Sequence, residues 1–498
     1  MRDPAPWQRR YGNMLIFSLL LGFAGQYLFV GNSPGLSVLL FTAGFYGLFF
    51  YSAKGRMGGF ERWRGQRGTG WLLTVPAALL AVSFMLLANP FFRTLNWLVL
   101  AALLGAQTLL LTRGGSQPWH RIAFYKDLLV QAVAAPLAHI AVPFELAAER
   151  LKSGSKEEGS TGRGVFRRVM LGLLMASPLL LVVTVLLASA DGIFMSWMNR
   201  IADPASWGSF GGLLQRFIVG ALIALYAFCY IWGLLFRKET PGEAWDRPAI
   251  AEPKADRGMD PVAAGSALVS INLVYVLFAG IQFSYLFGAA DGLLPEGLVY
   301  AEYARRGFAE LIVVCLINQG LLIFGLHYIR PAGPAGERFR KLLLSLLTVC
   351  TAVMLLSAYS RLSMYEEAYG YTHARLLAHG FMLFLAVLMA AALVRVWLAR
   401  FSLAKVYIAA AIAAYVALNY ANLDARIVDG NAARYERTGL IDVDYLSVLS
   451  ADAAPALERL VAAYPELDGA AARLDELRRE AGERRGWPSW NLAWHRLR

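Results

Sequence analysis

Apolar runs of about twenty residues recur along this chain, with short polar segments between them. A helix rises about 1.5 Å per residue, so a run of this length crosses a hydrocarbon core of roughly 30 Å. The sequence predicts eleven spans, near residues 12–30, 34–53, 71–88, 94–112, 169–190, 211–236, 262–287, 307–327, 342–359, 374–398 and 403–421. The predicted fold class is therefore all-α, a polytopic transmembrane helical bundle.

The polar segments divide these spans into three groups. Residues 1–112 contain the first four spans, 169–236 contain spans five and six, and 262–421 contain spans seven to eleven with a polar cluster at their outer ends. Three arginines precede the first run, which is too long for a signal-peptide core. We therefore expect this run to remain as a membrane anchor.

Three further segments are not expected to span. Residues 113–168 predict a cytoplasmic loop with interfacial amphipathic helices, because charges and prolines interrupt the apolar positions. The alternative is a re-entrant span within 119–150. Residues 237–261 combine prolines with alternating charges and predict a disordered cytoplasmic linker. Residues 422–498 are soluble in composition and predict a small helical tail, in which Asp452 is expected to cap a helix.

The distribution of Lys and Arg predicts the orientation. If the N-terminus is cytoplasmic, the cytoplasmic segments hold 29 Lys or Arg and the opposite loops hold six. Short loops that carry positive charge stay in the cytoplasm, so the N-terminus should lie inside and the C-terminal tail outside. The net charge of +12 then faces anionic lipid of the bilayer, and no nucleic acid is needed as a partner.

Composition agrees with a membrane protein. The chain is 57% hydrophobic and 16% charged, whereas a soluble domain has about 25% charged residues. It contains no P-loop, no HExxH, no GxSxG and no cysteine or histidine cluster. We therefore assign no catalytic residue, no metal ligand and no cofactor from motifs, and an enzyme is the less favoured class.

Polar and charged residues gather at the outer ends of the later spans. Three segments far apart in the sequence deliver them to one membrane face: Arg361, Tyr365, Glu366, Arg375 and His379 around spans nine and ten, Glu302 and Arg305 before span eight, and Asp424 after span eleven. Arginine presents a fixed fork of donors that suits a carboxylate or phosphate. The cluster predicts a pocket that binds an anionic lipid or envelope component, in order to move or sense it.

Three alternatives remain open for these residues. The arginines could pair with Glu302, Glu366 or Asp424 and only hold loops, while the tyrosines form an interfacial aromatic belt. The chain could instead be an enzyme that acts on a lipid-linked substrate at this face, with His379 or Glu366 as base. It could also be a scaffold or sensor that acts through its tail.

With these segments in place, the chain resembles a family of membrane proteins known as domain of unknown function 4173, which is related to number 4153. The resemblance implies a multi-pass protein of the bacterial plasma (inner) membrane and implies no reaction, substrate or protein partner. It covers about residue 260 to the end. It is carried by Gln282–Gly288, Tyr300–Phe308, Tyr365–Thr372 with Arg375, Asn422–Arg426, Asp444–Ser447, Leu449–Asp452 and Trp487–Asn491.

Overall fold

Helices make up most of the part of the chain that the structure describes. The computed structural model describes residues 6–57, 66–112, 117–153, 210–236, 258–288, 308–398, 402–484 and 486–498, together with Val183, Leu187 and Ser196. Ten helices among these residues are long and apolar enough to cross a membrane. The predicted all-α bundle is confirmed, and the chain is a multi-pass membrane protein. The span predicted near 169–190 lies outside the described residues.

The chain divides into two compact units. Unit 1 comprises Met1–Leu86, Arg93–Trp245 and Arg484–Leu492, and unit 2 comprises Leu87–Phe92, Asp246–Glu483 and Ala493–Arg498. The short segment Leu87–Phe92, which includes the start of a span, therefore groups with unit 2.

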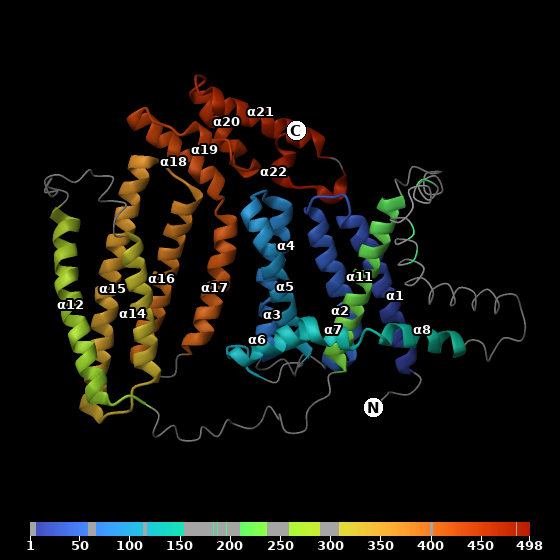
Figure 1. Ribbon diagram of the computed structural model, residues 1–498, viewed down its shortest axis with the longest axis horizontal. Coiled ribbons are helices and arrows are strands. Elements are labelled where there is room, and N and C mark those ends of the chain that lie inside the picture. The colour runs from blue at the N-terminus through green and yellow to red at the C-terminus, as the bar shows by residue number, and fades with distance from the viewer. Residues whose placement is uncertain are drawn as a thin grey trace, which may run out of the picture. The chain divides into compact units, whose positions relative to one another are not determined.

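Unit 1 consists of membrane spans and shorter helices that cross their ends. Its helices are α1 (Pro6–Phe29), α2 (Leu36–Met57), α3 (Gln66–Leu72), α4 (Thr74–Leu86), α5 (Pro90–Thr112), α6 (Ile122–Leu129), a π-helical turn (Val130–Ala134), α7 (Ala135–Ala138), α8 (Val142–Ser153), α11 (Phe210–Leu235) and the 3₁₀ turn Trp487–Ser489. Helices α3 and α4 together form one span, Gly68–Leu86. Helices α6 to α8 run across the ends of the spans (Figure 1).

Small residues allow α1 and α11 to approach closely. A Cβ atom on Gly22 would collide with the carbonyl oxygen of Gly220. Lipid supplies little hydrophobic drive for association between helices, so membrane helices gain stability from close packing of this kind.

Unit 2 contains five long span helices and a helical tail that covers one of their ends (Figure 1). The spans are α12 (Pro261–Gly288), α14 (Phe308–His327), α15 (Pro334–Tyr369), α16 (His373–Trp397) and α17 (Leu403–Tyr420). The tail contains α18 (Leu423–Thr438), α19 (Val443–Leu446), the 3₁₀ turn Ala451–Ala453, α20 (Ala454–Ala463), α21 (Asp468–Glu483) and α22 (Leu492–His495).

Helix α15 is longer than the bilayer core is thick. Its 36 residues extend over about 54 Å. Arg340 and Arg361 lie 21 positions apart on it, or about 32 Å, which is close to the thickness of the hydrocarbon. Both guanidinium groups can therefore reach a headgroup region, one at each end of the span. We call the Arg361 end the outer end and the Arg340 end the inner end.

The tail fixes the C-terminus of α15. Arg434, which is 7% exposed, donates to the carbonyl oxygens of Glu367 (2.9 Å) and Ala368 (2.7 Å). Asn431 accepts a hydrogen bond from the Tyr371 amide (2.8 Å) and donates to the Tyr371 carbonyl (3.0 Å). These side chains satisfy backbone groups that a helix end leaves without partners. The tail is thus bonded to the turn between α15 and α16.

The tail also has its own apolar core. Ile427 and Val428 of α18 pack with residues of α20 and α21, among them Leu457 and Leu477, all of them fully buried. Within the soluble segment 422–498, helices α18 to α21 thus form a compact helical subdomain of unit 2, whereas Arg484–Leu492 group with unit 1.

Candidate functional site

The predicted site residues within the described ranges all belong to unit 2. They are Arg361, Tyr365 and Glu366 in the last turns of α15, Arg375 and His379 in the first turns of α16, and Asp424 in the first turn of α18. A three-residue turn joins α15 to α16, so these helix ends lie together at the outer end (Figure 1). Glu302 and Arg305 lie outside the described residues.

A buried glutamine on α12 orients Arg361. The Oε1 atom of Gln282 accepts hydrogen bonds from Ser357 Oγ (2.6 Å) and from Arg361 Nη2 (3.0 Å). Ser357, Arg361 and Tyr365 follow one another at intervals of four, so they share one face of α15. The amide oxygen of Gln282 positions the guanidinium group without neutralising its charge.

Arg375 lies against the same face of α15. Its guanidinium carbon is 4.5 Å from the ring centroid of Tyr365, in a cation–π contact. Its Nη1 atom donates to the carbonyl oxygens of Tyr369 (3.1 Å) and Gly370. Within the described part of the chain, Nη1 is the only atom of this group that is hydrogen-bonded and no carboxylate pairs with it. Neutral groups therefore hold the cation in place.

Glu366 and His379 form a buried acid–base pair between α15 and α16. Nε2 of His379 lies 3.0 Å from Oε2 of Glu366, and the side chains are 11% and 5% exposed. The ring of Tyr359 packs edge-on against the imidazole, with 4.3 Å between the ring centroids. The other polar atoms, Oε1 of Glu366 and Nδ1 of His379, are buried without a hydrogen-bond partner among the described residues. Each such atom is costly, and it marks a place where a further polar group could bind.

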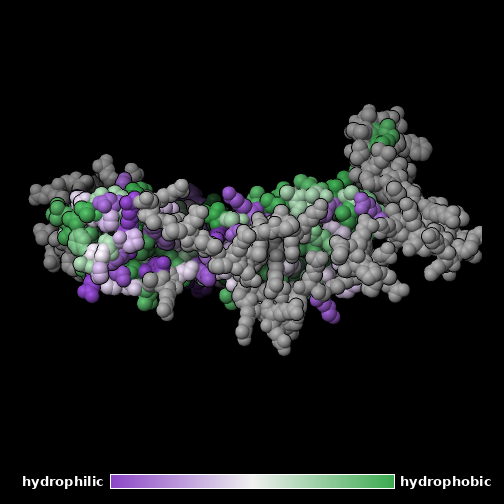
Figure 2. All heavy atoms as spheres, turned by 90° about the horizontal axis from the view of Figure 1, so that it is seen from below, coloured by the Kyte–Doolittle hydropathy of each residue, from purple (hydrophilic) through white to green (hydrophobic). Residues whose placement is uncertain are grey.

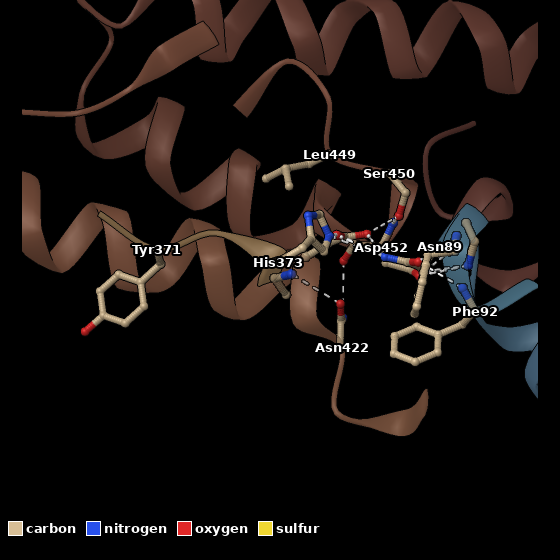
Figure 3. A network of polar contacts seen from close by, with 12 residues as sticks. Asn89, Phe92, Tyr371, His373, Asn422, Leu449, Ser450 and Asp452 are labelled. Carbon is tan, nitrogen blue, oxygen red and sulfur yellow. Dashed lines mark hydrogen bonds and ion pairs between the residues drawn. The ribbon is translucent and has the colours of Figure 1, made fainter. Parts of the chain in front are cut away.

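Asp424 takes part in a different set of contacts (Figure 3). It is 1% exposed and accepts hydrogen bonds from His373 Nε2, Ser450 Oγ and Asn89 Nδ2, the last at 3.2 and 3.1 Å from its two oxygens. The hydroxyl of Tyr445 accepts from the His373 amide (2.9 Å) and contacts Nδ1 of the same histidine (3.0 Å). Asp424 therefore joins four segments of unit 2 and is not paired with Arg361 or Arg375 in the bonds described.

The environment of Asp424 favours its charged form. Burial by itself raises the pKa of the carboxyl group. Hydrogen bonds from His373 and Ser450, the charge of His373 and the hydrogen bond from Asn89 outweigh that effect. The pKa of Asp424 is consequently below its usual value of 3.8.

Asp452 does not act as the expected helix cap. Its carboxylate accepts hydrogen bonds from the backbone amides of Ala88 (2.8 and 2.9 Å) and Asn89 (2.8 Å). Ser450 caps the 3₁₀ turn instead, through the Asp452 amide. The sequence pattern identified a capping segment but not the partner, because the loop that Asp452 binds lies 363 positions away.

Sequence reasoning did not assign Asn89, His373 or Ser450 to this site. Asn89 stands directly before Pro90, and its Oδ1 atom accepts from the amides of Phe91 (3.1 Å) and Phe92 (3.3 Å) at the start of α5. An asparagine before a proline is a recognisable helix-start signal. It gives no information about contact with Asp424.

No metal centre is found among the described residues, since no group of three or more His, Cys, Asp or Glu side chains lies close enough together. The three cysteines are buried free thiols, which is consistent with a role as small apolar residues of the core: Cys229, Cys315 and Cys350.

Comparison with known proteins gives one family. The profile of domain of unknown function 4153 (DUF4153) matches residues 74–460, which is most of the chain. The sequence alone indicated a resemblance to family 4173 and, as its relative, to family 4153. The match is to family 4153, and membership of family 4173 stays a prediction. No curated protein and no solved structure matches.

Proposed function

We propose that this chain, which belongs to the DUF4153 family and crosses the membrane many times, binds the anionic headgroup of a lipid or envelope component at its outer end. In binding it, the protein would move or sense that component. The proposed site, the arginine cluster, consists of Arg361, Tyr365 and Arg375. Its setting would be the bacterial plasma membrane.

The observation that carries the proposal is that no carboxylate among the described residues neutralises Arg375. Two of the carboxylates that could have paired with it are engaged elsewhere: Glu366 with His379, and Asp424 with His373. Its described contacts are carbonyl oxygens and an aromatic ring, which orient the guanidinium group and leave Nε and Nη2 available for an anion. A guanidinium fork of this kind matches a phosphate or carboxylate.

The position of the cluster supports a headgroup as the ligand. Arg361 lies about 14 Å beyond the midpoint of α15, which corresponds to the edge of a core of roughly 30 Å. Tyr365 follows one turn later, at the depth where tyrosine rings commonly meet lipid headgroups. A ligand there would meet Arg375 and the Tyr365 ring, with Arg361 one turn earlier on the same face of α15.

The test uses full-length protein in detergent, titrated with phosphatidylglycerol and followed by native mass spectrometry. Arg361→Gln together with Arg375→Gln should weaken binding roughly tenfold to a hundredfold, since a hydrogen bond to a charged group contributes about 1.5–3 kcal/mol. The matched control is Arg437→Gln with Arg459→Gln, which removes the same charge from exposed positions in the tail. Equal binding by both folded double variants would refute the proposal.

A second candidate, an enzyme acting on a lipid-linked substrate, is favoured by the Glu366–His379 pair. A catalytic base is commonly oriented by a hydrogen bond to a second side chain, and the 3.0 Å separation between His379 Nε2 and Glu366 Oε2 fits such an arrangement. Both side chains face the protein interior between α15 and α16 instead of lipid. A substrate group would have to enter beside them and meet Nδ1 of His379.

This candidate has a separate test. The protein is incubated with a bacterial lipid extract that contains lipid-linked precursors, and consumption of each species is followed by mass spectrometry. The enzyme predicts turnover that Glu366→Gln and His379→Gln abolish while phosphatidylglycerol binding persists. If no species is consumed faster by the wild-type protein than by these variants, the pair has a structural role.

A further inference from the structure

An open groove lies at the inner end of unit 2, away from the arginine cluster. It has a volume of about 540 Å³ and runs between the start of α12 and the start of α15, with residues 329–332 at its mouth. A short bridge holds this mouth in place, since Met259 accepts from the Arg330 amide (3.1 Å) and donates to the Tyr328 carbonyl (2.9 Å). The groove is therefore bounded by bonded backbone on one side and two helices on the others.

The walls of the groove are mostly apolar. Val262, Leu268, Val269, Phe339 and Leu343 line it. Val262 is 79% exposed and Phe339 is 51% exposed, so these side chains are available to an occupant. The α12 wall from Val262 to Val269 rises about 10 Å, which runs from the headgroup region toward the hydrocarbon. This shape and chemistry suit an acyl chain better than a soluble metabolite.

The mouth of the groove is basic. Arg330 and Arg340 belong to its lining, and the exposed Arg338 stands between the lining residues Glu337 and Phe339 in the sequence, whereas the ammonium group of Lys341 lies over the Trp397 ring of α16. Three arginines, Arg330, Arg338 and Arg340, face two carboxylates, those of Glu337 and Asp260, which leaves one positive charge in excess; the Asp260 carboxylate is also hydrogen-bonded to the first amides of α12. Hydrophilic and hydrophobic residues adjoin in this region when unit 2 is seen from the inner end (Figure 2).

Arg340 has capacity for another acceptor. Its Nη1 atom donates to the Gly325 carbonyl (2.7 Å) and Nη2 to Glu337 Oε2 (2.6 Å). Its Nε atom is buried without a hydrogen-bond partner among the described residues. A phosphate oxygen at the mouth of the groove would satisfy a group that is costly to leave unpaired.

We propose that this groove binds an anionic phospholipid from the inner leaflet, with one acyl chain between α12 and α15 and the phosphate at Arg330 and Arg340. Charge complementarity selects this occupant, because a zwitterionic or cationic lipid gains less from the basic mouth. The site is independent of the arginine cluster, which lies at the other end of α15.

Gly265 allows the groove to be filled without disturbing the fold. A Cβ atom there would meet only Phe339, at 4.0 Å, and replacing glycine within a helix favours the helical state. Gly265→Leu should therefore fold and occupy the space of the acyl chain. Gly320→Leu is the matched control, because a Cβ atom on Gly320 meets nothing within 4 Å and this residue does not line the groove.

The experiment measures binding of phosphatidylglycerol and phosphatidylcholine to the full-length protein by native mass spectrometry. Each variant is measured both in the wild-type protein and in the Arg361→Gln, Arg375→Gln protein, so that lipid bound at the arginine cluster is distinguished from lipid bound in the groove. In the Arg361→Gln, Arg375→Gln background, Gly265→Leu should weaken phosphatidylglycerol binding at least tenfold. In the wild-type background it should lower the number of bound phosphatidylglycerol molecules by one, and Gly320→Leu should change neither result. Arg330→Gln should reduce the preference for phosphatidylglycerol over phosphatidylcholine, and Arg338→Gln should reduce it less.

Three results would overturn the proposal. The first is equal phosphatidylglycerol binding by the two leucine variants, and the second is equal affinity for the two lipids in the wild-type protein. The third is the loss of a dimer in Gly265→Leu with lipid binding intact, which would assign the groove to a second copy of the chain.

Discussion

The side-chain amide of Asn89 donates to both carboxylate oxygens of Asp424, at 3.2 and 3.1 Å, across 335 positions of sequence. Asn89 stands at the start of a span, and Asp424 stands at the start of the tail. With His373 and Ser450 on the same carboxylate, this contact joins the tail to the outer end of unit 2.

Removing the charge of Asp424 should loosen the tail. The Asp424 carboxylate accepts hydrogen bonds from three side chains through its two oxygens, whereas the amide of Asp424→Asn has only one oxygen that can accept. We expect a loss of about 3–5 kcal/mol, the usual cost of breaking a buried charged network. Faster proteolysis within residues 422–498 of the detergent-solubilised protein would report it. The control Asp429→Asn, at an exposed position paired with Arg459, should change stability by less than about 0.5 kcal/mol.

The same carboxylate predicts how the attachment of the tail depends on pH. The folded pKa of Asp424 is below 3.8, so its contribution is present above the unfolded value and is lost as pH falls through the folded value. The contribution of Asp424 to hydrogen exchange in α18, corrected for the intrinsic rate, should be constant from pH 7 to about pH 5. Exchange should accelerate below about pH 4, where the carboxylate becomes protonated. Asp424→Asn should remove that acid-dependent part. Acceleration of equal size in the variant would show that another group is responsible.

Gly370 is required at the end of α15 for two reasons. Its φ is +84°, and a Cβ atom would lie 2.5 Å from Asn431 Oδ1, which holds Tyr371. Because its ψ is 174°, Gly370 also lies outside the left-handed helical region, in a backbone conformation that is nearly confined to glycine, so Gly370→Ala should cost more than the roughly 1–2 kcal/mol expected for a left-handed residue. Gly439→Ala is the comparison, because its φ is +69° and nothing lies within 4 Å of the added atom. Equal loss of thermal stability in the two variants would mean that neither the backbone conformation of Gly370 nor the contact with Asn431 adds to the cost.

Sidedness is open to a direct test. The excess of Lys and Arg on one side predicts that Arg498 emerges away from the cytosol. Alkaline phosphatase fused after Arg498 should be active, and a green fluorescent protein at the same place should be dark. The reverse pattern would exchange the two faces and place the arginine cluster in the cytoplasm.

The sequence predicted the spans well and the contacts between distant segments poorly. Span length follows from the thickness of the hydrocarbon, so ten predicted spans correspond to observed helices. The four-residue spacing of Arg361 and Tyr365 placed them on one face because helix geometry alone decides that. Glu366 and His379 lie 13 positions apart across one turn, a separation at which adjacent helices pack. The partners of Asp424 and Asp452 depend on how the tail docks, which no local pattern encodes.

The proposed binding site illustrates the same limit. An anionic ligand was predicted from residue types alone, and the site was expected to include Asp424. The described contacts place Asp424 with His373 instead, which leaves Arg375 without a carboxylate partner in the described ranges. Whether a carboxylate of the chain neutralises an arginine depends on tertiary packing. Residue types could therefore suggest an anionic ligand, but they could not show which arginines lack a carboxylate partner among the described residues.

A cryo-electron microscopy map of the full-length protein in phosphatidylglycerol nanodiscs tests the central claim most directly. The arginine cluster predicts headgroup density about 3 Å from Nε or Nη2 of Arg375, beside the ring of Tyr365. That density should be absent from a map of the Arg361→Gln, Arg375→Gln protein. A well-resolved Arg375 that faces only water or a carboxylate of the chain, with no lipid density beside Tyr365, would contradict the proposed function.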